Sequence, residues 1–148
     1  MADNYTLFSE VIEELTPEAC EWVRIVLNID PTSVYYQFAR VKEILHITDR
    51  PALDLVNWPN FKWKIDEDSL WLYSEEGYDG DHLIVFVQAL LRNFMPDFIF
   101  TMTTAEICSK PRASQFGGEW LAISKDEVQG GNTWDEAKKV AVAMRGGV

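Results

Sequence analysis

The loop at residues 105–119 holds the densest group of chemically capable side chains in the sequence. A thiol and two cations follow one another there at a spacing of two residues, at Cys108, Lys110 and Arg112. A cysteine beside two cations can be activated as a nucleophile. Such a nucleophile normally needs a base, and the two histidines, His46 and His82, are remote in the sequence. The alternative, which we favour, is that Cys108 is a small buried hydrophobe at the end of a strand.

The same loop has the chemistry of an anion site. Cations, hydroxyls and glycine-rich backbone all suit a phosphate or carboxylate ligand, and the loop supplies Ser109, Lys110, Arg112, Ser114, Gly117 and Gly118. The P-loop pattern is absent from the sequence. The alternative is structural, because Arg112 can instead pair with Glu106, Glu119 or the acidic hairpin and hold the loop in place. The glycine pair then permits a bulge or close packing under Trp120.

Charge is distributed unevenly along the chain. The net charge is −11, and residues 1–105 carry 18 acids and 7 bases whereas residues 106–148 carry 6 of each. An acid excess repels phosphate backbones, which disfavours direct binding of nucleic acid. It suits a cationic protein partner, or mimicry of nucleic acid towards a DNA-binding protein. The acids Asp66, Glu67 and Asp68, in a predicted hairpin turn, are the candidate contacts, although an acidic surface also serves solubility.

Composition restricts the remaining classes of function. Two cysteines are too few for a disulfide scaffold and are expected as free thiols. The cysteines and histidines form no ligand pair at zinc-site spacing, so neither a metal nor a cofactor is expected. No apolar run reaches the length of a bilayer span, and the N-terminus lacks the features of a signal peptide. A cytoplasmic protein without a membrane interaction is the expectation, and the 148 residues predict a single globular domain, 1–148.

The elements that position these residues follow from local patterns. Helices are predicted from Thr16-Pro17, from residue 32 or 33 to about residue 45, over about residues 81–95 with Asp79 or Asp81 as cap, and from Thr133. Strands are predicted at residues 61–66, 70–74, 98–104 and 120–123, the first from its period-two alternation. The order α-α-β-β-α-β-β-α predicts an α+β fold of about four mainly antiparallel strands covered by helices. The order of the strands in the sheet stays open.

Two further segments are predicted to form short elements. Tyr5, Leu7 and Phe8 are expected in a short extended arm, and Ser124-Lys125-Asp126-Glu127 has the spacing of a capping box that opens a single turn.

Several short motifs resemble small uncharacterised bacterial proteins found on phages, prophages and plasmids. The motifs are Phe61-Lys62-Trp63, Leu70-Trp71-Leu72, Phe86-Val87-Gln88, Phe94-Met95-Pro96-Asp97, Ala105-Glu106-Ile107-Cys108-Ser109-Lys110-Pro111-Arg112 and Phe116-Gly117-Gly118. The resemblance covers roughly residues 60–124. It implies a bacterial or phage origin and an accessory role, and it brings no catalytic residue with it.

Three hypotheses for function follow. The leading one is a non-enzymatic accessory protein of phage or mobile-element origin that binds a macromolecular partner, most simply a protein, through the Cys108–Gly118 loop and the acidic hairpin. The second is an acidic DNA mimic that inhibits a bacterial defence or DNA-binding protein. The third is a small enzyme or anion-binding domain that uses the loop. The sequence leaves the oligomeric state open.

Overall fold

The structure, a computed structural model, describes residues 3–29, 40–47, 53–113 and 115–146. These residues form eight strands in three hydrogen-bonded sheets, so the prediction of about four strands in the order α-α-β-β-α-β-β-α is wrong. The elements are β1 (Asn4–Leu7), β2 (Ser9–Ile12), α1 (Pro17–Leu27), a helical stretch at 40–44, β3 (Lys62–Asp66), β4 (Ser69–Tyr73), α3 (Gly80–Phe94), β5 (Phe100–Thr103), β6 (Ala105–Cys108), β7 (Glu119–Ile123), β8 (Val128–Asn132) and α4 (Thr133–Met144). The class is α+β.

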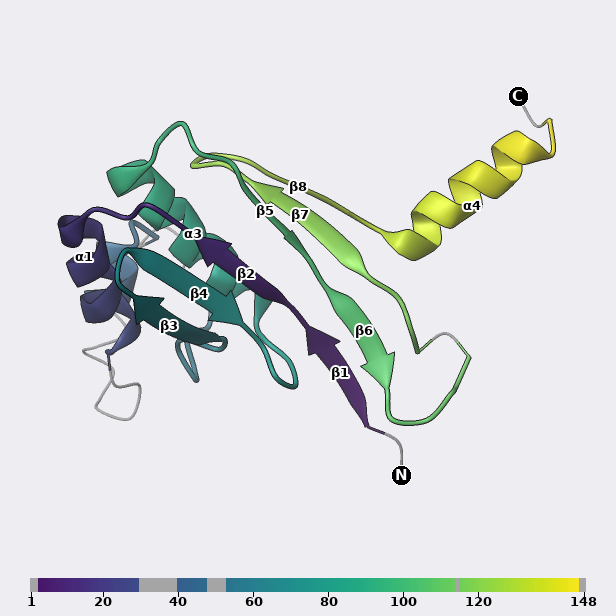
Figure 1. Ribbon diagram of the computed structural model, residues 1–148, viewed down its shortest axis with the longest axis horizontal. Helices are drawn as coiled ribbons and strands as arrows, with labels where there is room; N and C mark the ends of the chain where they lie inside the picture. Colours follow the sequence, from purple (N-terminus) through teal and green to yellow (C-terminus); the bar gives the residue numbers. More distant parts are fainter. Residues whose placement is uncertain (1–2, 30–39, 48–52, 114, 147–148) are drawn as a thin grey trace.

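Every strand pairing is antiparallel. The sheets have the orders β2-β4-β3, β1-β6 and β5-β7-β8. The N–H of Thr103 in β5 donates to the Glu10 carboxylate in β2 over 3.2 Å, which places these two strands side by side. The three sheets therefore follow one another in a single twisted layer with β3 at one edge and β8 at the other (Figure 1).

The expected N-terminal arm is a central strand of this layer. β1 and β2 continue one another and are interrupted at Phe8, a buried residue. The Phe8 N–H donates to Ser74 Oγ over 3.1 Å, and the Ser74 N–H donates to the Phe8 carbonyl over 3.0 Å. The segment becomes a strand because partners from two distant parts of the chain take up its backbone groups.

Two further strands come from segments predicted differently. The strand predicted at 98–104 is longer and continues as β6, because the Thr104 N–H between β5 and β6 still donates to Glu119 across the sheet, over 2.8 Å. The turn predicted at Ser124 joins β7 to β8. The Ser124 side chain accepts the N–H of Glu127 over 2.9 Å and thereby closes a hairpin where we expected a helical turn.

The helix predictions from capping signals are confirmed where the structure describes the residues. Thr16 Oγ1 accepts the N–H of Ala19 over 3.1 Å at the start of α1. Asp79 caps α3 by accepting the N–H groups of Asp81 and His82. α4 begins as predicted at Thr133, although its cap is Asn132. Most of the helix predicted up to residue 45 lies outside the described residues, and its end at 40–44 is helical.

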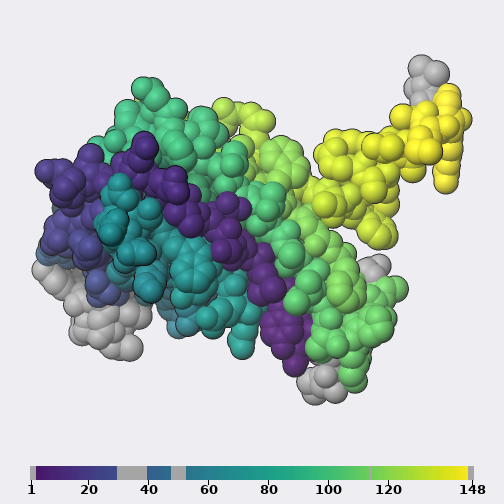
Figure 2. All heavy atoms as spheres, viewed as in Figure 1, coloured from purple at the N-terminus to yellow at the C-terminus, as the bar shows by residue number. Residues whose placement is uncertain are grey.

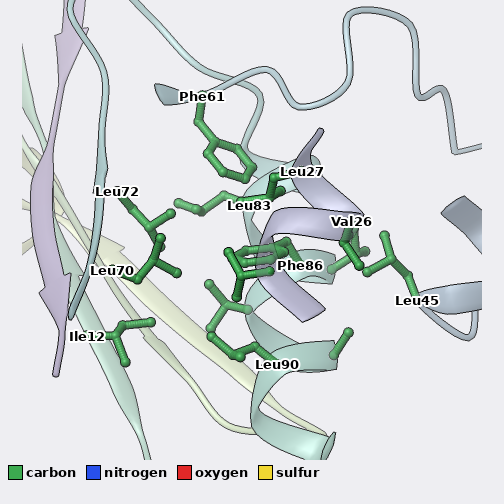
Figure 3. Close-up of a cluster of buried hydrophobic side chains, with 14 of the residues drawn as sticks. Ile12, Val26, Leu27, Leu45, Phe61, Leu70, Leu72, Leu83, Phe86 and Leu90 are labelled. Atoms are coloured by element: carbon green, nitrogen blue, oxygen red, sulfur yellow. The ribbon is translucent and has the colours of Figure 1, made fainter. Parts of the chain in front are cut away.

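The core lies between the sheet and the helices α1 and α3 (Figure 3). Nine of the fifteen residues of α3 are buried, as its nearly all-round apolar sequence requires. α4 is different. None of its twelve residues is buried, and it projects away from the body of the molecule (Figures 1 and 2).

Candidate functional site

The two predicted contact regions lie at opposite ends of the molecule. Their separation follows from the pairing of the N-terminal strands. Asn4 pairs with Cys108 beside the loop, and Ile12 pairs with Leu70 beside the hairpin turn. Eight residues of extended chain span about 27 Å. The loop and the acidic hairpin therefore cannot line one pocket.

The hairpin turn has a fixed backbone and exposed acids. The carbonyl oxygens of Asp68 and Glu67 accept from the Leu15 N–H over 2.9 Å and from the Cys20 thiol over 3.9 Å. Asp66, Glu67 and Asp68 are all exposed. This turn is charged, and its three acids do not line the cleft beside Gly117 and Gly118 that is described below.

Cys108 occupies the structural role that we favoured. It is the last residue of β6 and is only 8% exposed, and both cysteines are free thiols, as predicted. Neither described histidine is in a position to activate it. His46 is exposed next to residues 40–44, while His82 is fully buried and accepts the Asn60 N–H at Nδ1 over 3.1 Å. His82 Nε2 contacts the Asp54 carbonyl over 2.8 Å.

Lys110 and Arg112 lie beyond the strand in solvent. Both are exposed, and the ion pair of Arg112 with Glu106, Glu119 or the hairpin does not form among the described residues. The start of the loop is held instead by Ser109, which donates its N–H to the Asp3 carbonyl and accepts the Asp3 N–H at Oγ, each over 2.8 Å. Ser114 lies outside the described residues. The cations and the thiol are therefore not assembled into a site.

The glycine pair has a definite structural role. Gly117 bonds Glu106 through both backbone groups, over 2.9 and 3.1 Å, in an isolated antiparallel bridge that lies beyond the paired strands β5 and β7. A Cβ at Gly118 would lie 2.7 Å from the Thr104 carbonyl oxygen, so the two backbones approach closely there. The Gly118 N–H also donates to Thr133 Oγ1 at the start of α4, over 3.1 Å. The residue that lies under Trp120 is Gly131, and not the predicted pair.

A cleft of about 220 Å³ opens beside this glycine pair. Its lining residues are Glu106, Phe116, Gly117, Gly118, Glu119, Asn132, Thr133 and Trp134. Side chains alternate along a strand, so Glu119 faces the same side as the buried Ile123, beyond the end of the apolar core. Two aromatic rings flank the cleft, with Phe116 51% and Trp134 57% exposed.

The cleft is lined by two carboxylates, those of Glu106 and Glu119. Within the part of the chain that the structure describes, neither Glu106 nor Glu119 forms a salt bridge. Burial raises the pKa of the nearby Tyr78, and the carboxylates of Glu119 and Glu106 raise it further. The Trp134 ring already carries a cation, because Lys138 Nζ lies 4.8 Å from the ring centre. Two acids beside aromatic faces suit a positively charged group.

Sequence reasoning named most of these residues but not their grouping. Glu106 and Glu119 were considered only as partners for Arg112, although they bracket the loop and must approach one another if the flanking strands pair. Trp134 and Phe116 were not proposed as contacts. Among the described residues no group of three His, Cys, Asp or Glu side chains could hold a metal ion, and no helix is long and apolar enough to cross a bilayer.

Comparisons with family models, with curated proteins and with solved structures find no match for this chain. The resemblance to phage- and plasmid-borne proteins therefore stays a prediction, and the interpretation of the cleft rests on its own geometry and charge.

Proposed function

We propose that the chain is a non-enzymatic accessory protein that binds another protein, and that the cleft beside Gly117 and Gly118 receives a basic side chain of that partner. The observation that carries the proposal is that the Glu106 and Glu119 carboxylates, which form no salt bridge with a described residue, line one cleft together with the exposed rings of Phe116 and Trp134. A lysine or arginine would find its counter-charge and a ring face in the same small space.

The shape of the cleft supports a side chain rather than a whole small molecule. Its volume of about 220 Å³ is below the range of roughly 300–1,000 Å³ that is usual for small-molecule sites. An anchoring residue that enters a pocket, surrounded by weaker contacts, is the usual arrangement at protein interfaces. The net charge of −11 also draws a cationic partner towards the molecule.

Affinity capture from a bacterial lysate tests the proposal, because the suggested mobile-element origin makes host proteins the first partners to examine. The bait is the full chain, the cleft variant is Glu106→Gln with Glu119→Gln, and the matched control is Asp66→Asn with Asp68→Asn. Both variants remove two charges, at opposite ends of the molecule. We expect the wild type and the control to recover the same protein and the cleft variant to lose it.

Competition by duplex DNA separates this proposal from the DNA-mimic hypothesis. Binding that the cleft variant retains, that the hairpin variant loses and that duplex DNA competes away would favour mimicry and contradict the cleft proposal. The enzyme hypothesis has its own test. A thiol reagent that modifies Cys108 in the folded protein no more slowly than in the unfolded chain would contradict its burial.

A further inference from the structure

The two acids of the cleft occupy diagonal positions on neighbouring segments of extended chain. Glu106 lies opposite Gly117 in an antiparallel bridge. Glu119 lies opposite Thr104, whose N–H donates to the Glu119 carbonyl over 2.8 Å. Residues at diagonal positions of an antiparallel pair are about 7–8 Å apart. The cleft therefore presents its carboxylates as two separate acceptors, and not as one joined acid pair.

Gly117 forms the floor of the cleft, because it places no side chain opposite Glu106. A Cβ at Gly117 would lie 3.5 Å from Glu106 Oε2 and 3.9 Å from Thr133 Oγ1. Thr133 Oγ1 accepts the Gly118 N–H over 3.1 Å, and a hydroxyl oxygen has a second lone pair. The space over Gly117 is therefore surrounded by hydrogen-bond acceptors that lie in different directions.

Both carboxylates lie on the same side of the sheet as Tyr78. Burial raises the pKa of the Tyr78 phenol, and the carboxylates of Glu119 and Glu106 raise it further. Neither acid forms a salt bridge with a described residue. A cation that enters the cleft thus meets both carboxylates without first displacing another described cation from them.

Two exposed rings supply flat faces beside these acceptors. Phe116 is 51% and Trp134 57% exposed, and both line the cleft. Lys138 Nζ lies 4.8 Å from the centre of the Trp134 ring, but Lys138 lines the neighbouring groove and not the cleft. A planar cation can stack on an aromatic ring while its edges donate hydrogen bonds.

Arginine and lysine differ in how they meet such a site. A lysine ammonium is a compact, strongly hydrated point charge, whereas the guanidinium of arginine carries its N–H donors on several edges of a rigid plane. A guanidinium can therefore donate to two carboxylates on different sides of it and still offer a flat face to a ring. One carboxylate alone would serve either cation.

We propose that the cleft selects an arginine of the partner over a lysine, with one edge of the guanidinium on Glu106, another edge on Glu119 and its plane against an exposed ring. The inference rests on the proposed function, in which a basic side chain of a protein partner enters the cleft, and it names that side chain. Gly117 leaves the room that the guanidinium occupies.

Amide chemical shifts of the full chain, measured by NMR, test the preference without the partner. The probes are the Nα-acetyl N-methylamides of arginine, of lysine and of citrulline, which resembles arginine in shape but has no charge. We expect the arginine compound to shift the amides of Gly117 and Gly118 and the indole N–H of Trp134. One additional charge-assisted hydrogen bond should make its Kd about tenfold lower than that of the lysine compound. The citrulline compound should shift these signals least.

Single substitutions separate the preference for arginine from general attraction of cations. Glu106→Gln and Glu119→Gln, made one at a time, each leave one carboxylate and are expected to remove the preference. Gly117→Ala fills part of the floor at ordinary contact distances and should weaken the binding of both cations. The matched control is Gly77→Ala, where a Cβ meets nothing within 4 Å, and it should bind like the wild type. The dispersion of the same spectra shows that each variant is folded.

A lysine compound that binds as tightly as the arginine compound overturns the proposal. An equal response to citrulline also overturns it, because stacking would then be sufficient, and so does an arginine compound that shifts no signal of the cleft. If a captured partner is lost by the double cleft variant while arginine has no advantage, the proposed function stands and only this inference fails. A preference for arginine without any captured partner would contradict the proposed function instead.

Discussion

The helices α3 and α4 resemble one another in length and capping but differ in what they contact. Each begins after an acid or amide side chain, Asp79 or Asn132, that accepts a backbone N–H of the first turn. α3 buries nine residues against the sheet and α1, whereas α4 buries none. Short helices gain most of their stability from tertiary packing. α3 is therefore part of the folding unit, and α4 is held by its own caps until another surface meets it.

The sheet shows the same contrast. At the end that α1 and α3 cover, the face towards the helices is apolar; beyond them, the same face carries Glu106 and Glu119. Backbone hydrogen bonds still join the chain beyond β5 and β7, since Thr104 donates to Glu119 and Glu106 pairs with Gly117. Polar and aromatic groups on an ordered but uncovered sheet are available for binding.

The largest expected effect comes from a substitution in the core that α1 and α3 cover. Phe86 is fully buried among Trp22 and Phe61, and Phe86→Ala should lower the free energy of unfolding by about 3–5 kcal/mol. Val140→Ala on α4 should change the free energy of unfolding by less than about 0.5 kcal/mol. Urea unfolding measures both free energies. A comparable loss in the two variants would mean that α4 packs against the body.

A smaller effect tests whether the uncovered end is as well ordered as the core. Gly118→Ala places a methyl 2.7 Å from the Thr104 carbonyl oxygen and should cost about 1–3 kcal/mol of stability. Gly77→Ala, where a Cβ meets nothing within 4 Å, should be neutral or stabilise by less than about 1 kcal/mol. Equal unfolding midpoints would show that the glycine pair is not tightly packed.

The two helix caps give a matched comparison. Asp79→Ala removes the acceptor for two N–H groups at the start of α3 and should lower the free energy of unfolding of the body by about 1 kcal/mol. Asn132→Ala removes the corresponding acceptor of α4. It should reduce the helical circular dichroism signal and leave the unfolding midpoint of the body unchanged. A lower midpoint for Asn132→Ala would contradict the independence of α4.

The smallest effect is a pH dependence at the junction of the two ends. Burial, with Glu119 and Glu106, raises the pKa of Tyr78 in the folded state. The unfolded chain loses the phenol proton first, at about pH 10. The free energy of unfolding should therefore fall as pH rises from there towards the folded pKa. Tyr78→Phe should fall less steeply in alkaline urea titrations. An equal slope would mean that folding does not raise the pKa of Tyr78.

Local signals in the sequence predicted the elements that depend on local chemistry. Thr16-Pro17, Asp79 and the apolar run of α3 led to helices that the structure confirms. The alternation at residues 61–66 led to β3, and the apolar run after the turn led to β4. The class, α+β, followed from these.

The sequence could not indicate strands that exist through their partners. Residues 4–12 lack clean alternation and pair with segments far along the chain, and β8 contains two glycines that are disfavoured in strands except where a neighbour needs the space. Gly130 and Gly131 supply that space for Leu121 and Trp120. The cleft was missed for the same reason, because Glu106 and Glu119 meet only through the pairing register.

The N-terminal strand also sets the order in which the protein can fold during synthesis. Its bond from Asp3 to Ser109 joins residues 106 positions apart, so β1 waits for its partner until the loop after β6 has been synthesised. Until then their backbone groups have no strand to pair with, and such long-range pairing makes folding slow and exposes unpaired edges. We therefore expect nascent chains that end before β6 to depend on chaperones, and the layer to close only when the loop has emerged.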